Sequence, residues 1–162
     1  MPKKLLAPRE TSRSEAALHI LLTAERLFSE KGLDAVSTRS IAREAGQKNV
    51  SALHYYFGDK KKLIEAILDY RITPVNAERL TRLKRLKRSG DVISIKALVE
   101  LFVEPFALEL LKPLEHTCYI PLLAQLYASR WGRELYVGNR KRARELNEIT
   151  SLLIIKLVGN YK

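Results

Sequence analysis

The sequence predicts an all-α fold, and three observations support this prediction. Apolar residues recur at intervals of three and four along most of the chain, as they do on the buried face of a helix. No segment shows a convincing alternation of apolar and polar residues, the pattern that is typical of a strand. Residues that begin or end helices, such as serine, aspartate and glycine, flank the periodic segments.

Length and composition limit the class of protein. The chain has 162 residues, so it can bury a sizeable core in one or two small domains. Hydrophobic residues make up 46% of it, which excludes a disordered protein, and a single cysteine fits a reducing cytoplasm. No apolar run reaches the length of a membrane span, and the N-terminus lacks the apolar core of a secretory signal.

The net charge of +11 at pH 7 predicts an anionic partner. Residues 1–62 hold 12 Lys/Arg against 7 Asp/Glu, a sum of +5, and residues 63–90 hold 7 against 3, a sum of +4. The other residues hold 10 against 8, a sum of only +2. Four of the cations precede the predicted first helix, where they form either an arm that contacts the partner or a solubilising tail: Lys3, Lys4, Arg9 and Arg13.

The first predicted helix begins at a capping-box pattern, Ser12 with Glu15, and ends before Gly32. Its apolar positions lie on one face and comprise Ala17, Ile20, Leu21, Ala24, Leu27 and Phe28. We expect this helix to brace the shorter helices that follow it.

Residues 37–57 predict two short helices joined by a glycine-containing turn. Ser37 or Thr38 can cap the first helix, and Gly46 lies where a left-handed residue is favoured. Asn49 can cap the second helix, in which Leu53 and Phe57 would pack inward. The remaining positions of the second helix are small at first and hydrogen-bonding or aromatic later, as in a helix that enters the DNA major groove. The alternative is an ordinary helical hairpin in a core, but such a hairpin would not carry His-Tyr-Tyr on its outer face.

Asp59 is the predicted N-cap of a third helix, so Lys60, Lys61 and Lys62 fall in its first turn. Cations there oppose the helix dipole and cost about 0.3–1 kcal/mol each when exposed. Three lysines at a helix N-terminus therefore predict a bound phosphate, with Lys60 as the main contact, although any one of them can be a solvated surface lysine.

Four motifs together are specific: FSEKG at 28–32, VSTRSIA at 36–42, AG at 45–46 and LHYYFGDK at 53–60. Through them, residues 14–68 resemble the DNA-binding domain of the tetracycline-repressor (TetR) family of bacterial regulators. The turn over residues 46–49 is one residue longer than the commonest family form, and Val50-Ser51 replaces the usual small or glycine pair.

The resemblance implies roles for individual residues. It implies that Thr38 and Tyr56 contact phosphate, that Arg39 reaches a base, and that Lys60 binds the DNA backbone. It also implies that Ser51, Ala52 and Tyr55 face the groove. The full predicted set of DNA-binding residues is Thr38, Arg39, Lys48, Asn49, Ser51, Ala52, His54, Tyr55, Tyr56 and Lys60.

The second half of the chain is also predicted to be helical. The helix that starts at Asp59 is expected to break or kink at Pro74. Residues 79–88 hold six cations and three leucines, and predict either a helix that binds membrane surfaces or acidic partners, or a solvated basic face with its leucines in the core. Ser89-Gly90-Asp91 marks a loop, and further helices are expected over 92–112, 119–131 and 139–158.

In the TetR family this second half holds a ligand cavity and a dimer interface. The resemblance implies an unknown small-molecule effector, and an apolar segment at 150–157 needs a partner helix, which favours a homodimer. The candidate ligand-binding residues can equally be plain core: Phe102, Phe106, His116, Cys118, Tyr119, Leu123, Tyr127 and Trp131.

Several kinds of site are not expected. The chain has no glycine-rich phosphate loop and no recognisable catalytic motif, and His116 with Cys118 is a poor zinc signal. We therefore predict no enzyme, cofactor or metal.

The sequence as a whole predicts two domains. Residues 1–62 would form an arm and a three-helix helix-turn-helix DNA-binding domain, and residues 63–162 a helical ligand-binding and dimerisation domain. The predicted function is that of a homodimeric, ligand-responsive cytoplasmic repressor on a near-palindromic double-stranded DNA operator. The alternatives are a basic helical protein that binds membrane surfaces or acidic partners through residues 79–88, and a DNA-binding protein without a ligand.

Overall fold

A computed structural model describes residues 8–113, 117–138 and 146–159 of the chain. These residues form eight helices and no strand, which confirms the all-α prediction. The helices are α1 (Pro8–Lys31), α2 (Thr38–Glu44), α3 (Ser51–Phe57), α4 (Lys60–Arg88), α5 (Ile95–Leu110), α6 (Tyr119–Ala128), α7 (Arg130–Gly138) and α9 (Asn147–Gly159).

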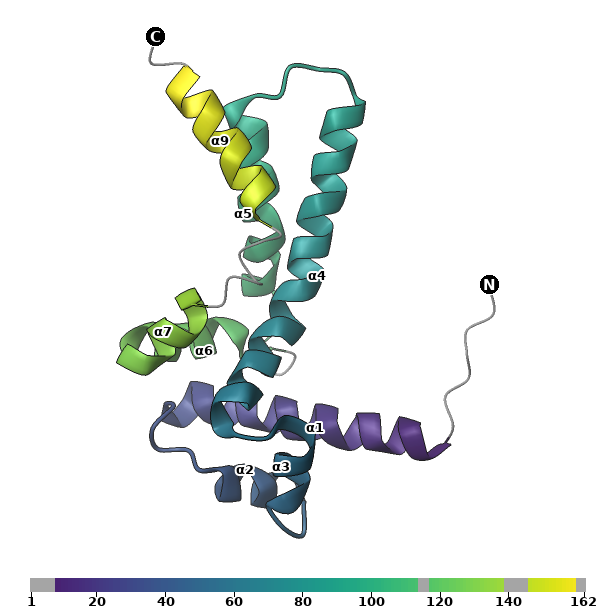
Figure 1. The fold of residues 1–162 in the computed structure, drawn as a ribbon, viewed down its shortest axis with the longest axis vertical. Coiled ribbons are helices and arrows are strands. Elements are labelled where there is room, and N and C mark those ends of the chain that lie inside the picture. The colour runs from purple at the N-terminus through teal and green to yellow at the C-terminus, as the bar shows by residue number, and fades with distance from the viewer. Residues whose placement is uncertain (1–7, 114–116, 139–145, 160–162) are drawn as a thin grey trace.

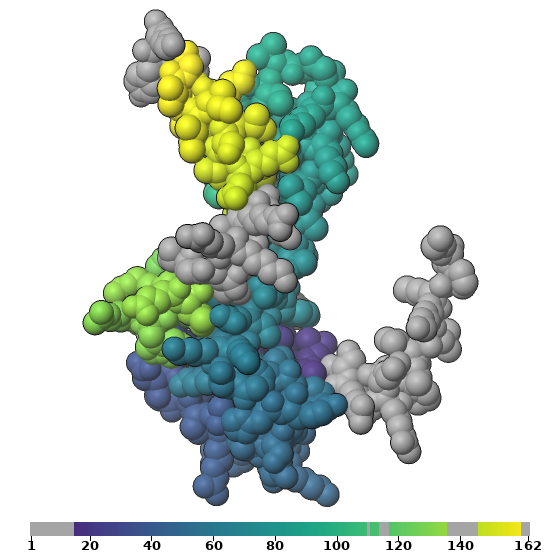
Figure 2. All heavy atoms as spheres, in the orientation of Figure 1, coloured from purple at the N-terminus to yellow at the C-terminus, as the bar shows by residue number. Residues whose placement is uncertain are grey.

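The longest helix, α4, connects the two ends of the molecule (Figure 1). At one end it contacts α1 and α3, and at the other end α5 lies beside it and α9 packs against α5. The short helix α6 packs against α1, and α7 packs against α6 and contacts α4. Figure 2 shows that α2 and α3 form the lower end of the molecule, where no later segment covers them in this view.

Two hydrophobic clusters hold these helices together. The larger cluster joins α1, α2, α3 and the first two turns of α4 to α6, which contributes Tyr119, Leu122, Leu123 and Leu126. The smaller cluster lies at the far end and contains Leu83 of α4, Leu98 and Leu101 of α5, and Ile149 of α9. The apolar face of α6 is therefore buried against the first three helices.

Three predicted helix boundaries are wrong. The first helix begins at Pro8, so Ser12 lies inside it and is not its N-cap. Proline is well suited to a first helical position because its missing N–H group would have no helical partner there. Arg9 and Arg13 of the predicted arm belong to this helix, while Lys3 and Lys4 lie outside the described residues.

Pro74 does not interrupt the helix, because α4 is continuous from Lys60 to Arg88, and the alternative of a kink at Pro74 stays a prediction. The predicted helix over 119–131 is instead two helices, which part at Ser129, where the backbone is extended. The last helix starts at Asn147, and residues 139–145 lie outside the described part of the chain. Among the described helices, none is long and apolar enough to cross a membrane.

Candidate nucleic-acid interface

Helix α2 is fixed at both ends by local hydrogen bonds. Ser37 is its N-cap, as predicted, and forms a capping box with Ser40: each side chain accepts a hydrogen bond from the other residue's backbone N–H group. At the C-terminal end Gly46 has φ +65°, and its N–H group donates to Arg43. The next N–H group, of Gln47, donates to Ala42, which completes a Schellman motif and turns the chain toward α3.

Helix α3 has one buried face and one exposed face. Leu53 is fully buried and Phe57, one turn later, packs against the larger cluster. Ser51, His54 and Tyr55 are exposed on the opposite side, and 70% of the surface of Tyr55 is accessible. This spacing of three and four places the exposed side chains on one face of the helix. The predicted inward position of Leu53 is confirmed. Of the three residues predicted to lie on the outer face, His54 and Tyr55 are exposed, whereas Tyr56 is half-buried.

Two of the predicted contact residues are partly buried. Ala52 and Tyr56 pack against the larger cluster, and the rings of Tyr55 and Tyr56 meet edge to face with centroids 5.1 Å apart. The ring of Tyr56 therefore lies between the hydrophobic cluster and the ring of Tyr55, and part of the surface of Tyr56 remains accessible.

The start of α3 differs from the prediction by one residue. The N-cap position is Val50, whose side chain makes no capping hydrogen bond, and Asn49 is one residue earlier. Asn49 Oδ1 still accepts a hydrogen bond from the N–H group of Ser51 at 2.8 Å, so it caps the helix from that earlier position. At the other end, His54 Nδ1 donates to the carbonyl oxygen of Gly58 at 2.5 Å, which leaves Nε2 of the neutral ring as an acceptor.

A positively charged depression of about 770 Å³ separates α2 from the start of α3. Four predicted DNA-binding residues line it: Thr38, Arg39, Lys48 and Asn49. Arg43, which is not among the predicted DNA-binding residues, also lines it and is exposed. Arg43 is one helical turn after Arg39, and that spacing was the signal that could have identified it.

Asp59 is the N-cap of α4, as predicted, and its Oδ1 accepts a hydrogen bond from the N–H group of Lys62 at 2.8 Å. Lys60, Lys61 and Lys62 occupy the first turn of α4, which confirms their placement at a helix N-terminus. Lys61 and Lys62 are exposed.

Lys60 is half-buried and lies between two aromatic rings. Its ammonium nitrogen is 5.7 Å from the ring centre of Phe28 and 5.9 Å from that of Trp131. Burial lowers the pKa of Lys60, an effect that the nearby carboxylate of Asp34 opposes only in part. The ammonium still has three donors, so contact with the rings leaves it able to bind a phosphate.

Helix α7 contacts the loop between α1 and α2. Trp131 donates a hydrogen bond from Nε1 to Asp34 Oδ1 at 2.8 Å. Gly132 packs so closely that an added Cβ atom would lie 2.7 Å from the carbonyl oxygen of Leu126 and 3.0 Å from Leu33. Helix α7 therefore packs directly against the loop that joins α1 to α2.

The predicted ligand-binding residues that the structure describes are distributed over both hydrophobic clusters and the surface near them. Phe106 and Tyr119 meet edge to face in the larger cluster, with ring centres 6.1 Å apart. Phe102 belongs to the smaller cluster at the other end, and His116 lies outside the described residues. The remaining four differ in exposure: Leu123 is buried, Cys118 and Trp131 are half-buried, and Tyr127 is exposed.

The basic segment 79–88 packs its leucines inward. Leu83 is buried and Leu86 is half-buried against the smaller cluster. Arg82 pairs with Glu78 and Glu104. This packing agrees in part with the interpretation of a solvated basic face whose leucines belong to the core. Arg79 departs from it, because its side chain is buried and donates to Asn76 and to the carbonyl oxygen of Phe102.

Comparison with known proteins gives the same assignment for the N-terminal region. Residues 20–67 match the family described as bacterial regulatory proteins, tetR family. Over 83 residues, 51% of this chain, the sequence is 37% identical to the HTH-type transcriptional repressor Rv3405c of Mycobacterium tuberculosis and to the HTH-type transcriptional regulator Mb3439c of Mycobacterium bovis. The chain spans less than half of the length of these relatives, since the aligned part covers 41% of each. Residues 20–67 of the chain therefore form a helix-turn-helix domain of the tetR family of bacterial regulatory proteins.

Proposed function

We propose that this regulator is a homodimeric, effector-responsive cytoplasmic repressor that places α3 of each subunit in the major groove of a near-palindromic operator. The observation that carries the proposal is the exposed face of α3, formed by Ser51, His54 and Tyr55, beside the cations Arg39 and Lys48. Hydroxyl, imidazole and guanidinium groups can bind base edges, and the cations attract the phosphate backbone. One relative is named as a repressor, which supports that direction of regulation.

The dimer would form through α9. This helix leaves Ile154, Ile155, Leu157 and Val158 exposed, and 65% of the surface of Ile155 is accessible. Four exposed apolar side chains on one 13-residue helix are favourable only if a partner covers them. A second copy of the chain would do so and would give the two-fold symmetry that a palindromic operator requires.

Selection of bound duplexes from a random DNA pool tests this function. We expect a near-palindrome whose half-sites are about 34–36 Å apart, or a multiple of that distance. Ile155→Glu should shift the protein to a monomer in light scattering and weaken its binding to the selected duplex. A selection that yields no shared sequence would exclude sequence-specific regulation.

The rival function, binding of membrane surfaces or acidic partners through residues 79–88, predicts a different result. Neutralising Lys84, Arg85 and Arg88, which are exposed, would abolish binding in the rival case. If the protein is instead the proposed DNA-binding regulator, the same neutralised variant should keep most of its operator affinity. Arg82 should be kept, because it pairs with Glu78 and Glu104 and its loss would disturb the fold.

A further inference from the structure

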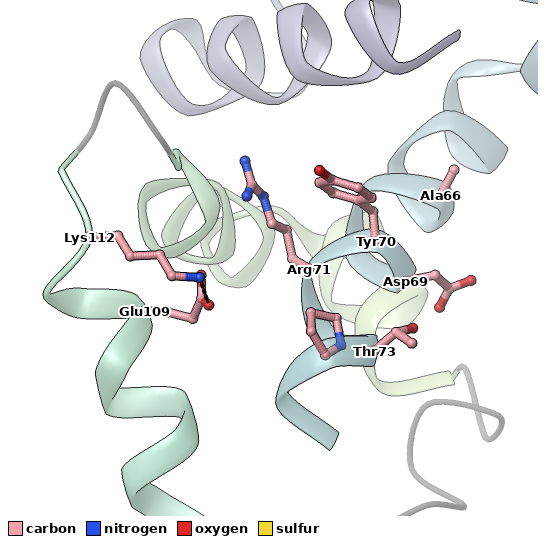
Figure 3. Close-up of a pocket in the computed structure, with 8 residues that line it drawn as sticks. Ala66, Asp69, Tyr70, Arg71, Thr73, Glu109 and Lys112 are labelled. Carbon is pink, nitrogen blue, oxygen red and sulfur yellow. Dashed lines mark hydrogen bonds and ion pairs between the residues drawn. The ribbon is translucent and has the colours of Figure 1, made fainter. Parts of the chain in front are cut away.

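A second cavity, of about 750 Å³, lies between α4 and the C-terminal end of α5 (Figure 3). Its wall on α4 runs from Ala66 to Pro74, and Glu109 and Lys112 close it from the other side. A volume of this order is sufficient for a small organic molecule. None of the predicted DNA-binding residues lines the cavity, and the proposed function names no site for its effector.

Glu109 brings an incompletely satisfied charge to this cavity. Its side chain is almost completely buried, and Oε1 pairs with the ammonium of Lys112. Oε2 is buried and has no hydrogen-bond partner among the described residues. A buried carboxylate oxygen without a donor is costly, so a ligand that displaces the atoms covering Oε2 and supplies a donor is favoured.

The formal charges of the residues that line the cavity, Asp69, Arg71, Glu109 and Lys112, sum to zero. Arg71 and Lys112 each pair with a carboxylate, whereas Glu109 Oε2 has no donor in the described part of the chain, so the cavity favours a ligand that donates to this oxygen. The guanidinium of Arg71 is bound to Glu25 by two hydrogen bonds of 2.6 and 2.8 Å, and so is already occupied. The ring of Tyr70 and the ring of Pro74 add apolar surface to the wall.

We propose that this cavity binds a small organic ammonium compound, whose charged nitrogen donates to Glu109 Oε2 and whose apolar part lies against Tyr70 and Pro74. The proposal deepens the effector response of the proposed function, because it names the chemical class of the effector and its site.

The site has a direct route to the DNA-binding helices. Arg71 lines the cavity from α4 and extends toward α1, where it binds Glu25 (Figure 3). An ammonium group bound at Glu109 would add a positive charge near Arg71 and weaken the pairing of Arg71 with Glu25. Because α1 braces α2 and α3, occupation of the cavity should lower operator affinity.

Ligand-observed NMR and calorimetry with 2-phenylethylamine, against the uncharged 2-phenylethanol, test the site without DNA. We expect the amine to bind at least about tenfold more tightly, since only it makes a charge-assisted hydrogen bond. Glu109→Gln should remove that preference, while Glu100→Gln, an exposed carboxylate on the same helix, should keep it. Equal binding of the two probes, no binding of either, or an unchanged preference in Glu109→Gln would each overturn the proposal.

Lys112→Met provides a second variant that keeps Glu109. It removes the competing ammonium from Oε1, so amine affinity should rise several-fold, whereas a decrease would contradict the proposed pairing. Operator binding with and without the amine is measured separately. If the protein binds the amine but no operator, the proposed function is refuted and the amine site is supported. If it binds an operator but no amine, the amine site is refuted and the proposed function is supported.

Discussion

Lys60→Met separates the contribution of Lys60 to DNA binding from its contribution to stability. The ammonium of Lys60 lies 5.7 Å and 5.9 Å from the ring centres of Phe28 and Trp131. Methionine is similar in length and packs well against aromatic rings. The variant therefore loses two cation–π contacts of about 0.5–1 kcal/mol each, but it also loses the cost of burying a charge. We expect its free energy of unfolding to remain within about 1 kcal/mol of that of the wild type.

The sign of this stability effect follows from the lowered pKa of Lys60. A lowered pKa means that the folded protein holds the proton less tightly than the unfolded chain. The penalty is therefore present at neutral pH and disappears as the pH rises above the pKa of the unfolded lysine. Any gain in stability from Lys60→Met should likewise be present at neutral pH and vanish at strongly alkaline pH.

The effect on DNA binding should be larger and should depend on salt. Each lost phosphate contact lowers the slope of log affinity against log salt by about 0.9, so a dimer that loses two contacts changes by about 1.8. Between about 50 and 200 mM salt, the wild type should therefore lose roughly twelvefold more affinity than the variant. Fluorescence anisotropy with the selected operator and with a scrambled duplex measures both slopes. Lys96→Met, at the exposed start of α5, is the control.

An unchanged slope in Lys60→Met would show that Lys60 makes no phosphate contact. A loss confined to the selected operator would instead assign Lys60 to base recognition, since phosphate contacts carry no direct sequence information.

Three further changes test other parts of the structure. Tyr55→Ala should reduce discrimination between operator and scrambled DNA by about 1–3 kcal/mol, and equal losses on both duplexes would remove Tyr55 from base recognition. Glu25→Gln should lower the free energy of unfolding in urea by about 3–5 kcal/mol, because it removes the charge of the buried carboxylate that accepts two hydrogen bonds from Arg71. Glu30→Gln at the surface should cost less than about 1 kcal/mol. Gly132→Ala should destabilise the fold by about 1–3 kcal/mol and so lower the melting temperature, because the added methyl group would lie 2.7 Å from the carbonyl oxygen of Leu126 in α6. An unchanged melting temperature would mean that α7 does not pack against α6 in solution.

The helix-turn-helix unit could be predicted from the sequence because its signals are local. The capping side chain of Ser37 bonds a backbone group three residues away, and that of Asp59 does the same. Gly46 ends α2 within the same few residues. Such contacts depend on neighbours in sequence, so propensity and spacing are sufficient to find them.

Pro74 shows where a local rule fails. A proline inside a helix costs about 3 kcal/mol or more, which is why a break was expected. Leu68, Ile72 and Val75 are buried on either side of it, and burial of each apolar side chain contributes about 1.5–3 kcal/mol. Continuation of the helix keeps all three in the core, so packing outweighs the cost of the proline.

The contacts between distant segments could not be predicted. Trp131 and Asp34 are 97 residues apart, and Arg71 and Glu25 are 46 apart. No periodicity in a single sequence relates such positions, and a tryptophan in an apolar helix predicts core in general without naming its partner. For the same reason the sequence does not predict the cavity at Glu109, because the cavity is lined by residues from two distant segments, α4 and the end of α5.

The two long-range contacts also limit how the DNA-binding unit can move. Asp34 is tied to α7 at one end of the unit, and Glu25 is tied to α4 through Arg71 nearer the middle of α1. A rotation of α1 relative to α4 must therefore change the Arg71–Glu25 pair, the Trp131–Asp34 hydrogen bond, or both. An effector can shift this equilibrium only by its difference in affinity for the two arrangements. A cation near Arg71 supplies such a difference, because it repels the guanidinium more strongly where Arg71 lines the cavity than where it has moved away.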